Sequence, residues 1–180
     1  HWYQVKGRQL SGSTIGIIGC GHIGKDLVKL LRPYNCKILA YDILNYKEFY
    51  EENKVTSVTL DNLLKESDVV SLHLPLDNST KNIINKERLQ MLKKNAVLIN
   101  LARGGLIDEK ALKKIVLEKK IGGVALDVFE IEPPIDKMLC LMDNVLITPH
   151  IGGSTEEAIL AMGIAAIDGL KNPKNPLELL

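Results

Sequence analysis

Short apolar runs alternate with amphipathic stretches along this chain. Six runs have the length and the β-branched, aliphatic composition of strands, and Gly, Pro, Asp and Asn flank them. They cover residues 14–19, 37–42, 68–74, 95–101, 122–128 and 144–149. Apolar positions recur at helical spacing between and after these runs, in residues 23–31, 61–65, 86–92, 109–117 and 155–170. Strands that alternate with helices predict a parallel sheet.

The strand candidates are apolar at almost every position, not at every second one. Strands of this kind are buried on both faces, so helices should cover both sides of the sheet. The predicted fold class is therefore α/β, with a doubly wound parallel sheet of the Rossmann type. There is no internal repeat, low-complexity segment or Pro/Gly/Ser-rich linker, which predicts a single domain over residues 13–180. The polar residues 1–12 look like a connection from something upstream.

Composition narrows the possible partners. The 180 residues are 46% hydrophobic and 25% charged, with a formal net charge of +1. That balance gives no reason to expect a nucleic-acid partner. No apolar run approaches the roughly 18 residues of a membrane span, and no signal peptide opens the sequence, so we expect a soluble, cytoplasmic protein with no membrane partner. Cys20, Cys36 and Cys140 lack C-x-x-C spacing, which favours reduced thiols over disulfides, and no residue cluster has metal-site spacing.

The stretch TIGIIGCGHIG is a strand followed by glycines spaced as G-x-G-x-x-G. In a dinucleotide-binding turn, Gly19 would allow the tight turn, Gly21 the close approach of the backbone to a pyrophosphate, and Gly24 the packing of helix on strand. His22 and Ile23 would then lie at a helix N-terminus, where free N–H groups and the helix dipole attract phosphate. A tight turn with no ligand can carry the same glycines, so the motif needs its context.

Asp42 supplies part of that context. It ends the second predicted strand, and the dinucleotide fold places an acidic residue about 20 positions after the glycines to accept hydrogen bonds from the adenosine ribose. A carboxylate there also repels a 2′-phosphate, which favours NAD over NADP. The alternative is an ordinary turn residue at the end of a strand.

Polar groups at the ends of the later strands suggest a reaction. Arg103 lies in NLARGGLID, the acidic residues Asp127, Glu130 and Glu132 lie in DVFEIEPP, and His150 lies in TPHIGGST. The carboxyl ends of parallel strands meet at one edge, where open α/β sheets bind ligands. Arginine can grip a substrate carboxylate and polarise a carbonyl. Histidine can exchange the hydroxyl proton of a 2-hydroxy acid, and a neighbouring carboxylate favours its protonated form.

Spacing alone leaves choices open among these side chains. Arg103 could be a capping or surface arginine, and His150 could have no chemical role. Glu130 and Glu132 stand two residues apart, and nothing in their spacing selects the partner of a histidine.

Taken together, the motifs resemble the nucleotide-binding domain of the D-isomer-specific 2-hydroxyacid dehydrogenases. The resemblance is carried, in order, by GRQLSGSTIGIIGCGHIG, SDVVSLHLPL, LINLARGGLIDEKAL, GGVALDVFEIEPP and LITPHIGGSTEEA. It implies an NAD-dependent oxidoreductase in which Arg103 binds and polarises substrate, His150 is the general acid/base, and Glu132 pairs with His150. The resemblance selects Glu132 over Glu130 because the family's catalytic carboxylate directly precedes proline.

The resemblance also completes the expected cofactor site. Motif and resemblance together place the following residues at NAD: Gly19, Gly21, His22, Ile23, Gly24, Asp42, Pro75, Thr80, Ala102, Arg103, Asp127, His150 and Gly152. Pro75 and Thr80 would otherwise be ordinary loop residues. His73 is expected to line the cofactor cleft without taking part in catalysis.

The resemblance implies a two-lobed protein with a second, substrate-binding lobe, and this sequence has no counterpart of that lobe. We therefore expect residues 13–180 to be the NAD-binding domain of a longer enzyme, with residues 1–12 as the crossover from the absent lobe, and we expect the domain alone to be poorly active. The motifs are most similar to the phosphoglycerate dehydrogenase branch, which implies 3-phosphoglycerate as substrate, a role in serine biosynthesis, and a homodimer.

Three other functions share part of the pattern. Glyoxylate and hydroxypyruvate reductases are near neighbours of the same branch. A non-enzymatic NAD-sensing module similar to the corepressors of this family could keep the Arg, Glu and His. An adenosylhomocysteinase shares the glycine motif but would lack the ordered ARGG, Glu-Pro and Pro-His clusters.

Overall fold

The computed structural model describes residues 7–135, 137–171 and 173. The chain divides into two compact units, His1–Thr148 and Pro149–Leu180, and each is described by itself. Of the expected crossover, residues 1–6 lie outside the described part, and residues 7–12 lead directly into the first strand.

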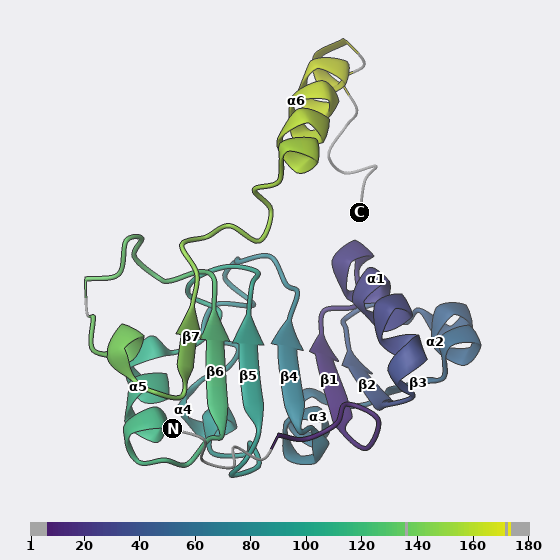
Figure 1. Cartoon of the computed structure of the whole chain (residues 1–180). Coiled ribbons are helices and arrows are strands. Elements are labelled where there is room, and N and C mark those ends of the chain that lie inside the picture. Colours follow the sequence, from purple (N-terminus) through teal and green to yellow (C-terminus); the bar gives the residue numbers. More distant parts are fainter. Residues whose placement is uncertain (1–6, 136, 172, 174–180) are drawn as a thin grey trace. The chain divides into compact units, whose positions relative to one another are not determined.

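A parallel sheet of seven strands organises the first unit (Figure 1). Its strands are β1 (Thr14–Ile18), β2 (Lys37–Tyr41), β3 (Val55–Ser57), β4 (Val69–Leu72), β5 (Val97–Asn100), β6 (Gly123–Leu126) and β7 (Val145–Ile147). Their order across the sheet is β3-β2-β1-β4-β5-β6-β7, so the strand order reverses between β1 and β4, with β2 and β3 on one side and β5 to β7 on the other. In open α/β sheets, a ligand crevice forms at such a reversal, outside the carboxyl ends of the strands.

Helices pack on both faces of this sheet and enclose two separate apolar clusters. The helices of the first unit are α1 (His22–Leu31), α2 (Lys47–Asn53), α3 (Leu60–Glu66), α4 (Lys86–Leu89) and α5 (Glu109–Leu117), with the 3₁₀ turns η1 (Arg32–Tyr34) and η2 (Leu139–Leu141). Val28 of α1 and Tyr50 of α2 join one cluster, around Ile15 and Ile17. The larger cluster contains buried side chains from α3, α4 and α5.

The predicted α/β class and doubly wound parallel sheet are confirmed, together with all six predicted strands. The pattern gave no sign of α2 and β3. β3 has only three residues, Val55–Ser57, and the last two are exposed, so no apolar run marks it. α4 ends at Leu89, earlier than its apolar positions suggested.

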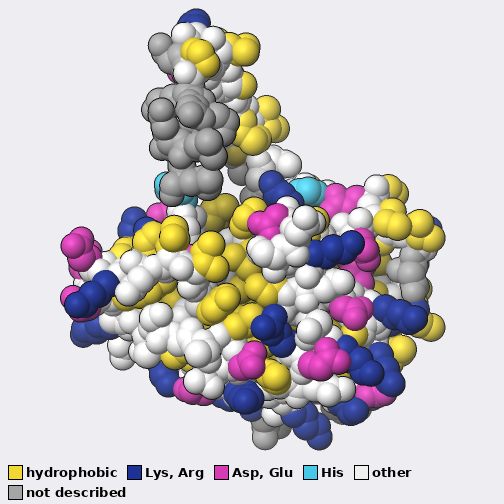
Figure 2. All heavy atoms as spheres, turned by 180° about the vertical axis from the view of Figure 1, so that it is seen from behind, with side chains coloured by type: hydrophobic (Ala, Val, Ile, Leu, Met, Phe, Trp, Pro, Cys, Tyr) yellow, Lys and Arg dark blue, Asp and Glu magenta, His cyan; other side chains and the backbone are white. Residues whose placement is uncertain are grey.

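The second unit contains helix α6, Glu156–Lys171. The Thr155 hydroxyl accepts a hydrogen bond from the Ala158 backbone N–H at the start of this helix, at 3.1 Å. Across the described residues, no helix is long and apolar enough to cross a membrane. On the face of the first unit seen in Figure 2, Lys and Arg side chains are interspersed with Asp and Glu.

Candidate functional site

The glycine loop joins the end of β1 to the start of α1, and two of its glycines are fixed by packing. Gly19 has φ +89°, and a Cβ there would lie 2.5 Å from the carbonyl oxygen of His73. A Cβ on Gly24 would overlap the carbonyl oxygen of Gly19. Both positions therefore require glycine for the protein's own packing.

Gly21 has different surroundings. It is the N-cap residue of α1, with φ −69°, and a Cβ there would meet no protein atom within 4 Å in the described part of the chain. By contrast, side chains of Thr59, Asn85 and Asp108 cap the N-termini of α3, α4 and α5. The glycine at position 21 thus leaves open space above the first turn of α1, at His22 and Ile23. Such a space suits a phosphate group.

Asp42 directly follows β2 and bonds to the glycine loop. One carboxylate oxygen accepts a hydrogen bond from the Cys20 backbone N–H at 2.6 Å, and the other accepts one from the Leu44 N–H at 2.8 Å. The carboxylate is therefore held beside the loop. Each oxygen can accept a further hydrogen bond, which is what a ribose diol would donate.

The loop after β4 contains Pro75 and Thr80. The Thr80 hydroxyl donates to the Pro75 carbonyl oxygen at 2.7 Å and accepts from the Asp77 N–H at 2.8 Å. The Ser79 hydroxyl, followed by the backbone N–H groups of Ser79 and Thr80, lowers the pKa of the Asp77 carboxyl. Thr80 therefore shapes the loop, and contact of Pro75 and Thr80 with a cofactor stays a prediction.

A buried side chain supports the loop of Ala102 and Arg103. Asn100, at the end of β5, is 2% exposed. Its amide donates to the Arg103 carbonyl oxygen at 2.9 Å and accepts from the Ala102 N–H at 3.1 Å. The Arg103 side chain is exposed, with its guanidinium donating to the Ala102 carbonyl oxygen at 2.7 Å. Sequence reasoning missed Asn100, although an amide side chain at the end of an apolar strand was a usable signal.

Asp127 follows β6 directly and is 2% exposed. Its carboxylate accepts a hydrogen bond from the Thr148 hydroxyl at 2.5 Å, and its N–H donates to the Asn100 carbonyl oxygen. These bonds join the ends of β5, β6 and β7. Thr148 is a second residue that sequence reasoning missed.

Glu132 lies in the loop after β6, and this loop meets the loop of Arg103 at Gly104. A Cβ on Gly104 would overlap the carbonyl group of Phe129. One Glu132 carboxylate oxygen accepts a hydrogen bond from the Phe129 N–H at 2.9 Å, and the Glu132–Pro133 peptide bond is cis. The structure thus brings the segments that carry Arg103 and Glu132 together at the carboxyl edge of the sheet.

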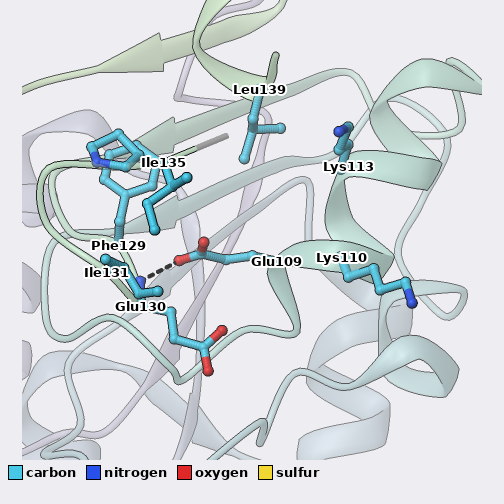
Figure 3. Close-up of a pocket in the computed structure, with 9 residues that line it drawn as sticks. Glu109, Lys110, Lys113, Phe129, Glu130, Ile131, Ile135 and Leu139 are labelled. Carbon is cyan, nitrogen blue, oxygen red and sulfur yellow. Dashed lines mark hydrogen bonds between the residues drawn. The ribbon is translucent and has the colours of Figure 1, made fainter. Parts of the chain in front are cut away.

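A pocket of about 410 Å³ lies between the start of α5 and the loop after β6 (Figure 3). It is lined by Glu109, Lys110, Lys113, Phe129, Glu130, Ile131, Pro134, Ile135 and Leu139. The pKa of the Glu109 carboxyl is raised, chiefly by burial and further by the nearby Glu130 and Glu132. The residues predicted for catalysis do not line this pocket.

His150 and Gly152 belong to the second unit. His150 has φ +54°, a left-handed conformation that is uncommon for residues other than glycine and that often occurs at functional sites. Arg103 and Glu132 belong to the first unit, and the meeting of His150 with them stays a prediction.

His73 lies just beyond β4, beside the glycine loop. Its Nε2 is 2.9 Å from the Ser71 hydroxyl oxygen, and burial lowers the pKa of the imidazole. Among the described residues, no group of three or more His, Cys, Asp and Glu side chains could hold a metal ion.

The residues at the switch between β1 and β4 fit a dinucleotide. The space above Gly21 and the N–H groups at the start of α1, which no side chain caps, suit a pyrophosphate, and the anchored Asp42 carboxylate suits a ribose. The fit to a dinucleotide is judged from the surroundings of the glycines and the hydrogen bonds of Asp42, not from the spacing of the glycines in the sequence.

Comparison with known proteins gives a consistent result. The family model for the D-isomer specific 2-hydroxyacid dehydrogenase, NAD binding domain, matches residues 1–152. A D-3-phosphoglycerate dehydrogenase of Methanocaldococcus jannaschii is 46% identical over 169 residues, which are 93% of this chain and 32% of that protein. A hydroxypyruvate reductase of Thermotoga maritima is 44% identical over 167 residues, 91% of this chain and 54% of that protein.

A solved structure has the same fold. The D-isomer specific 2-hydroxyacid dehydrogenase of Lactobacillus delbrueckii ssp. bulgaricus, in its NAD-complexed form, superimposes with a TM-score of 0.86 at 34% identity. The match covers 98% of this chain and 58% of that one. The chain thus spans between about a third and somewhat more than half the length of these relatives.

Proposed function

The chain belongs to the D-isomer-specific 2-hydroxyacid dehydrogenase family, as an NAD-binding domain, and from this membership we propose that the protein moves a hydride between NAD(H) and a 2-hydroxy acid. The observation that carries the proposal is the contact at Gly104 between the segments of Arg103 and Glu132. It brings together the two chain segments that carry Arg103 and Glu132, at the edge of the sheet where the dinucleotide fold binds its cofactor.

The proposed catalytic side chains have distinct roles. The Arg103 guanidinium binds the substrate carboxylate and polarises the C2 oxygen. His150 takes the proton of the C2 hydroxyl as the hydride leaves C2, and returns it in the reverse direction. Glu132 orients the imidazole and favours its protonated form. NAD supplies the hydride acceptor or donor.

The finer parts of the proposal concern substrate and assembly. The preferred substrate is 3-phosphoglycerate, which would give the protein a role in serine biosynthesis, with hydroxypyruvate and glyoxylate as the competing substrates. Residues 13–180 form the NAD-binding domain, and residues 1–12 are the crossover from a substrate-binding lobe. The protein is a cytoplasmic homodimer, and light scattering on the purified protein tests the dimer.

Steady-state kinetics on the protein at its full natural length tests the reaction. A panel of 2-hydroxy and 2-keto acids, each with NADH or NAD and with the phosphorylated cofactors in parallel, should reveal one preferred acid and a preference for NAD(H). If no acid is turned over while NAD still binds, the protein is a non-enzymatic NAD-binding module.

His150→Ala tests the acid/base assignment. We expect kcat to fall by a factor of about 10² to 10⁴, the usual contribution of a general acid/base, with the Kd for NAD changed less than twofold. A loss of NAD affinity with kcat unchanged would contradict the assignment.

A further inference from the structure

The peptide unit between Phe129 and Glu130 is held from two sides by one short segment of chain. Gly104 packs against the Phe129 carbonyl group, at a distance that leaves no room for a Cβ. Five residues later, a Glu109 carboxylate oxygen accepts a hydrogen bond from the Glu130 backbone N–H at 2.6 Å (Figure 3). Both contacts come from the stretch that links the Arg103 loop to α5.

The linking stretch is itself anchored. Ile84 and Ile107 form a parallel bridge, and the Asn82 N–H donates to the Gly105 carbonyl oxygen at 2.8 Å. Gly104 and Glu109 therefore act from a fixed support, not from a free loop.

The Glu132 carboxylate depends on the same peptide segment. One of its oxygens accepts the Phe129 N–H at 2.9 Å, so the backbone that Gly104 and Glu109 hold in turn holds Glu132. A shift of the Phe129–Glu130 backbone would move the Glu132 carboxylate with it.

Glu109 is not the residue that caps its own helix. Asp108 already caps α5, with a carboxylate oxygen accepting from the Ala111 N–H at 2.9 Å. Glu109 is half-buried beside the carboxylates of Glu130 and Glu132, surroundings that raise its pKa and therefore disfavour its charged form. The Glu109 carboxyl group is thus half-buried beside two other carboxylates and does not cap α5, which suggests that its hydrogen bond to the Glu130 N–H has another role.

We propose that Glu109 is a positioning residue, which fixes the loop after β6 so that the Glu132 carboxylate stands at a set distance from Arg103. The inference rests on the proposed function, because it assigns Glu109 a task in that reaction. Glu109 acts through the Glu130 backbone N–H and touches neither substrate nor cofactor.

Two substitutions in the full-length protein test the role. Glu109→Ala removes the acceptor, and we expect kcat to fall about tenfold, since small displacements of catalytic groups can cost up to about 10²-fold. KM and the Kd for NAD should stay within twofold. Glu109→Gln keeps an acceptor oxygen and should retain at least half of the kcat. Glu118→Ala, which removes a carboxylate at the other end of α5, is the matched control and should leave kcat unchanged.

Nuclear magnetic resonance of the 180-residue chain tests the hydrogen bond without any activity. The Glu130 amide proton should shift as Glu109 titrates, lose that titration in Glu109→Gln, and exchange with solvent at least tenfold faster in Glu109→Ala. An unchanged kcat in Glu109→Ala, an equal loss of kcat in both variants, or a loss of NAD affinity that parallels kcat would overturn the inference.

The two proposals fail in different ways. If the unmodified protein turns over no 2-hydroxy acid, the proposed function fails, and the amide experiment still reports on the Glu109–Glu130 contact. If the unmodified protein is active and Glu109→Ala is as active, only the positioning role fails.

Discussion

Gly21 and Gly24 stand three positions apart in one motif, yet an added methyl group would meet different surroundings at each. At Gly24 it would overlap the Gly19 carbonyl oxygen, and at Gly21 it would meet no described protein atom within 4 Å. Packing therefore requires glycine at position 24, whereas position 21 has open space in which a ligand could lie.

Alanine at the two positions should separate stability from binding. We expect Gly24→Ala to lower the free energy of unfolding by about 1–3 kcal/mol, as overpacking usually does. Gly21→Ala should cost less than about 1 kcal/mol, an N-cap effect, while it weakens NAD binding at least tenfold by obstructing the pyrophosphate. Urea unfolding and fluorescence titration with NADH measure the two effects. Equal destabilisation by both substitutions would contradict this account.

The sequence could predict a cofactor site, because the expected roles of Gly19 and Asp42 follow from their positions at strand ends, and contact of these residues with NAD stays a prediction. Gly19, Gly24 and Asp42 lie where the dinucleotide pattern put them, with contacts that fit their predicted tasks. Thr148 was missed because its hydroxyl bonds to Asp127, at the end of a neighbouring strand that only the folded sheet brings near. Asn100 was missed although its partners, Ala102 and Arg103, lie in the loop directly after it. The roles of Arg103, Glu132 and His150 in catalysis remain predictions.

At the scale of elements, α5 links the fold to the proposed chemistry. The side chain of its N-cap residue, Asp108, accepts a hydrogen bond from the Ala111 N–H. The backbone N–H of Asp108 donates to the Ile84 carbonyl oxygen at 3.0 Å. The helix start is therefore fixed to the segment that also supports Gly104 and Glu109.

Loss of this cap should cost stability. We expect Asp108→Ala to lower the free energy of unfolding by about 1 kcal/mol, because the Ala111 N–H loses its partner and the helix dipole loses a negative charge. Asp108→Asn keeps the acceptor and should recover most of that loss. Urea unfolding of the three proteins decides, and equal losses in both variants would show that the cap is not the cause.

Apolar patterning, more than length, decided which elements the sequence could predict. The strands that became β1, β2 and β4 are apolar enough to stand out, because both faces of the sheet are covered there. β3 lies at the edge of the sheet, and its exposed Thr56 and Ser57 carry no pattern from which burial could be inferred. α2 is similarly marked only by two buried positions, Tyr50 and Asn53.

At the scale of the whole molecule, Asp68 joins three central strands at their amino ends. Its carboxylate accepts from the Thr14 N–H at 2.9 Å and pairs with the Lys93 ammonium at 3.0 Å. Its N–H donates to the Thr14 carbonyl oxygen, and its carbonyl oxygen accepts from the Val97 N–H. The Thr14 N–H, followed by Lys93, lowers the pKa of the Asp68 carboxyl.

This lowered pKa predicts how stability changes in acid. The stabilisation by Asp68 is fully present above the pKa of an unfolded aspartate, about 3.9, and is lost as the pH falls through the lower folded value. Asp68→Asn should therefore lower the free energy of unfolding by about 1–2 kcal/mol at pH 7 and approach the unmodified protein as the pH falls.

Urea unfolding at a series of pH values measures this convergence. Asp26→Asn, which removes an exposed carboxylate paired with Lys29, is the control and should change stability little at any pH. Parallel curves for Asp68→Asn and the unmodified chain would contradict the prediction.

The strand order has a consequence for how the chain is made. β1 is synthesised before the other strands of this sheet, yet it lies between β2 and β4, and Ile15 pairs with Val69. A nascent chain that ends before β4 has one edge of β1 unpaired, an edge prone to pairing with other chains. Gly19 packs against the His73 carbonyl group, so this contact cannot form until His73 has been synthesised. His73 must therefore leave the ribosome before the glycine loop can take its final shape. The glycine loop is synthesised before the other segments of the proposed cofactor site, yet it reaches its final conformation late.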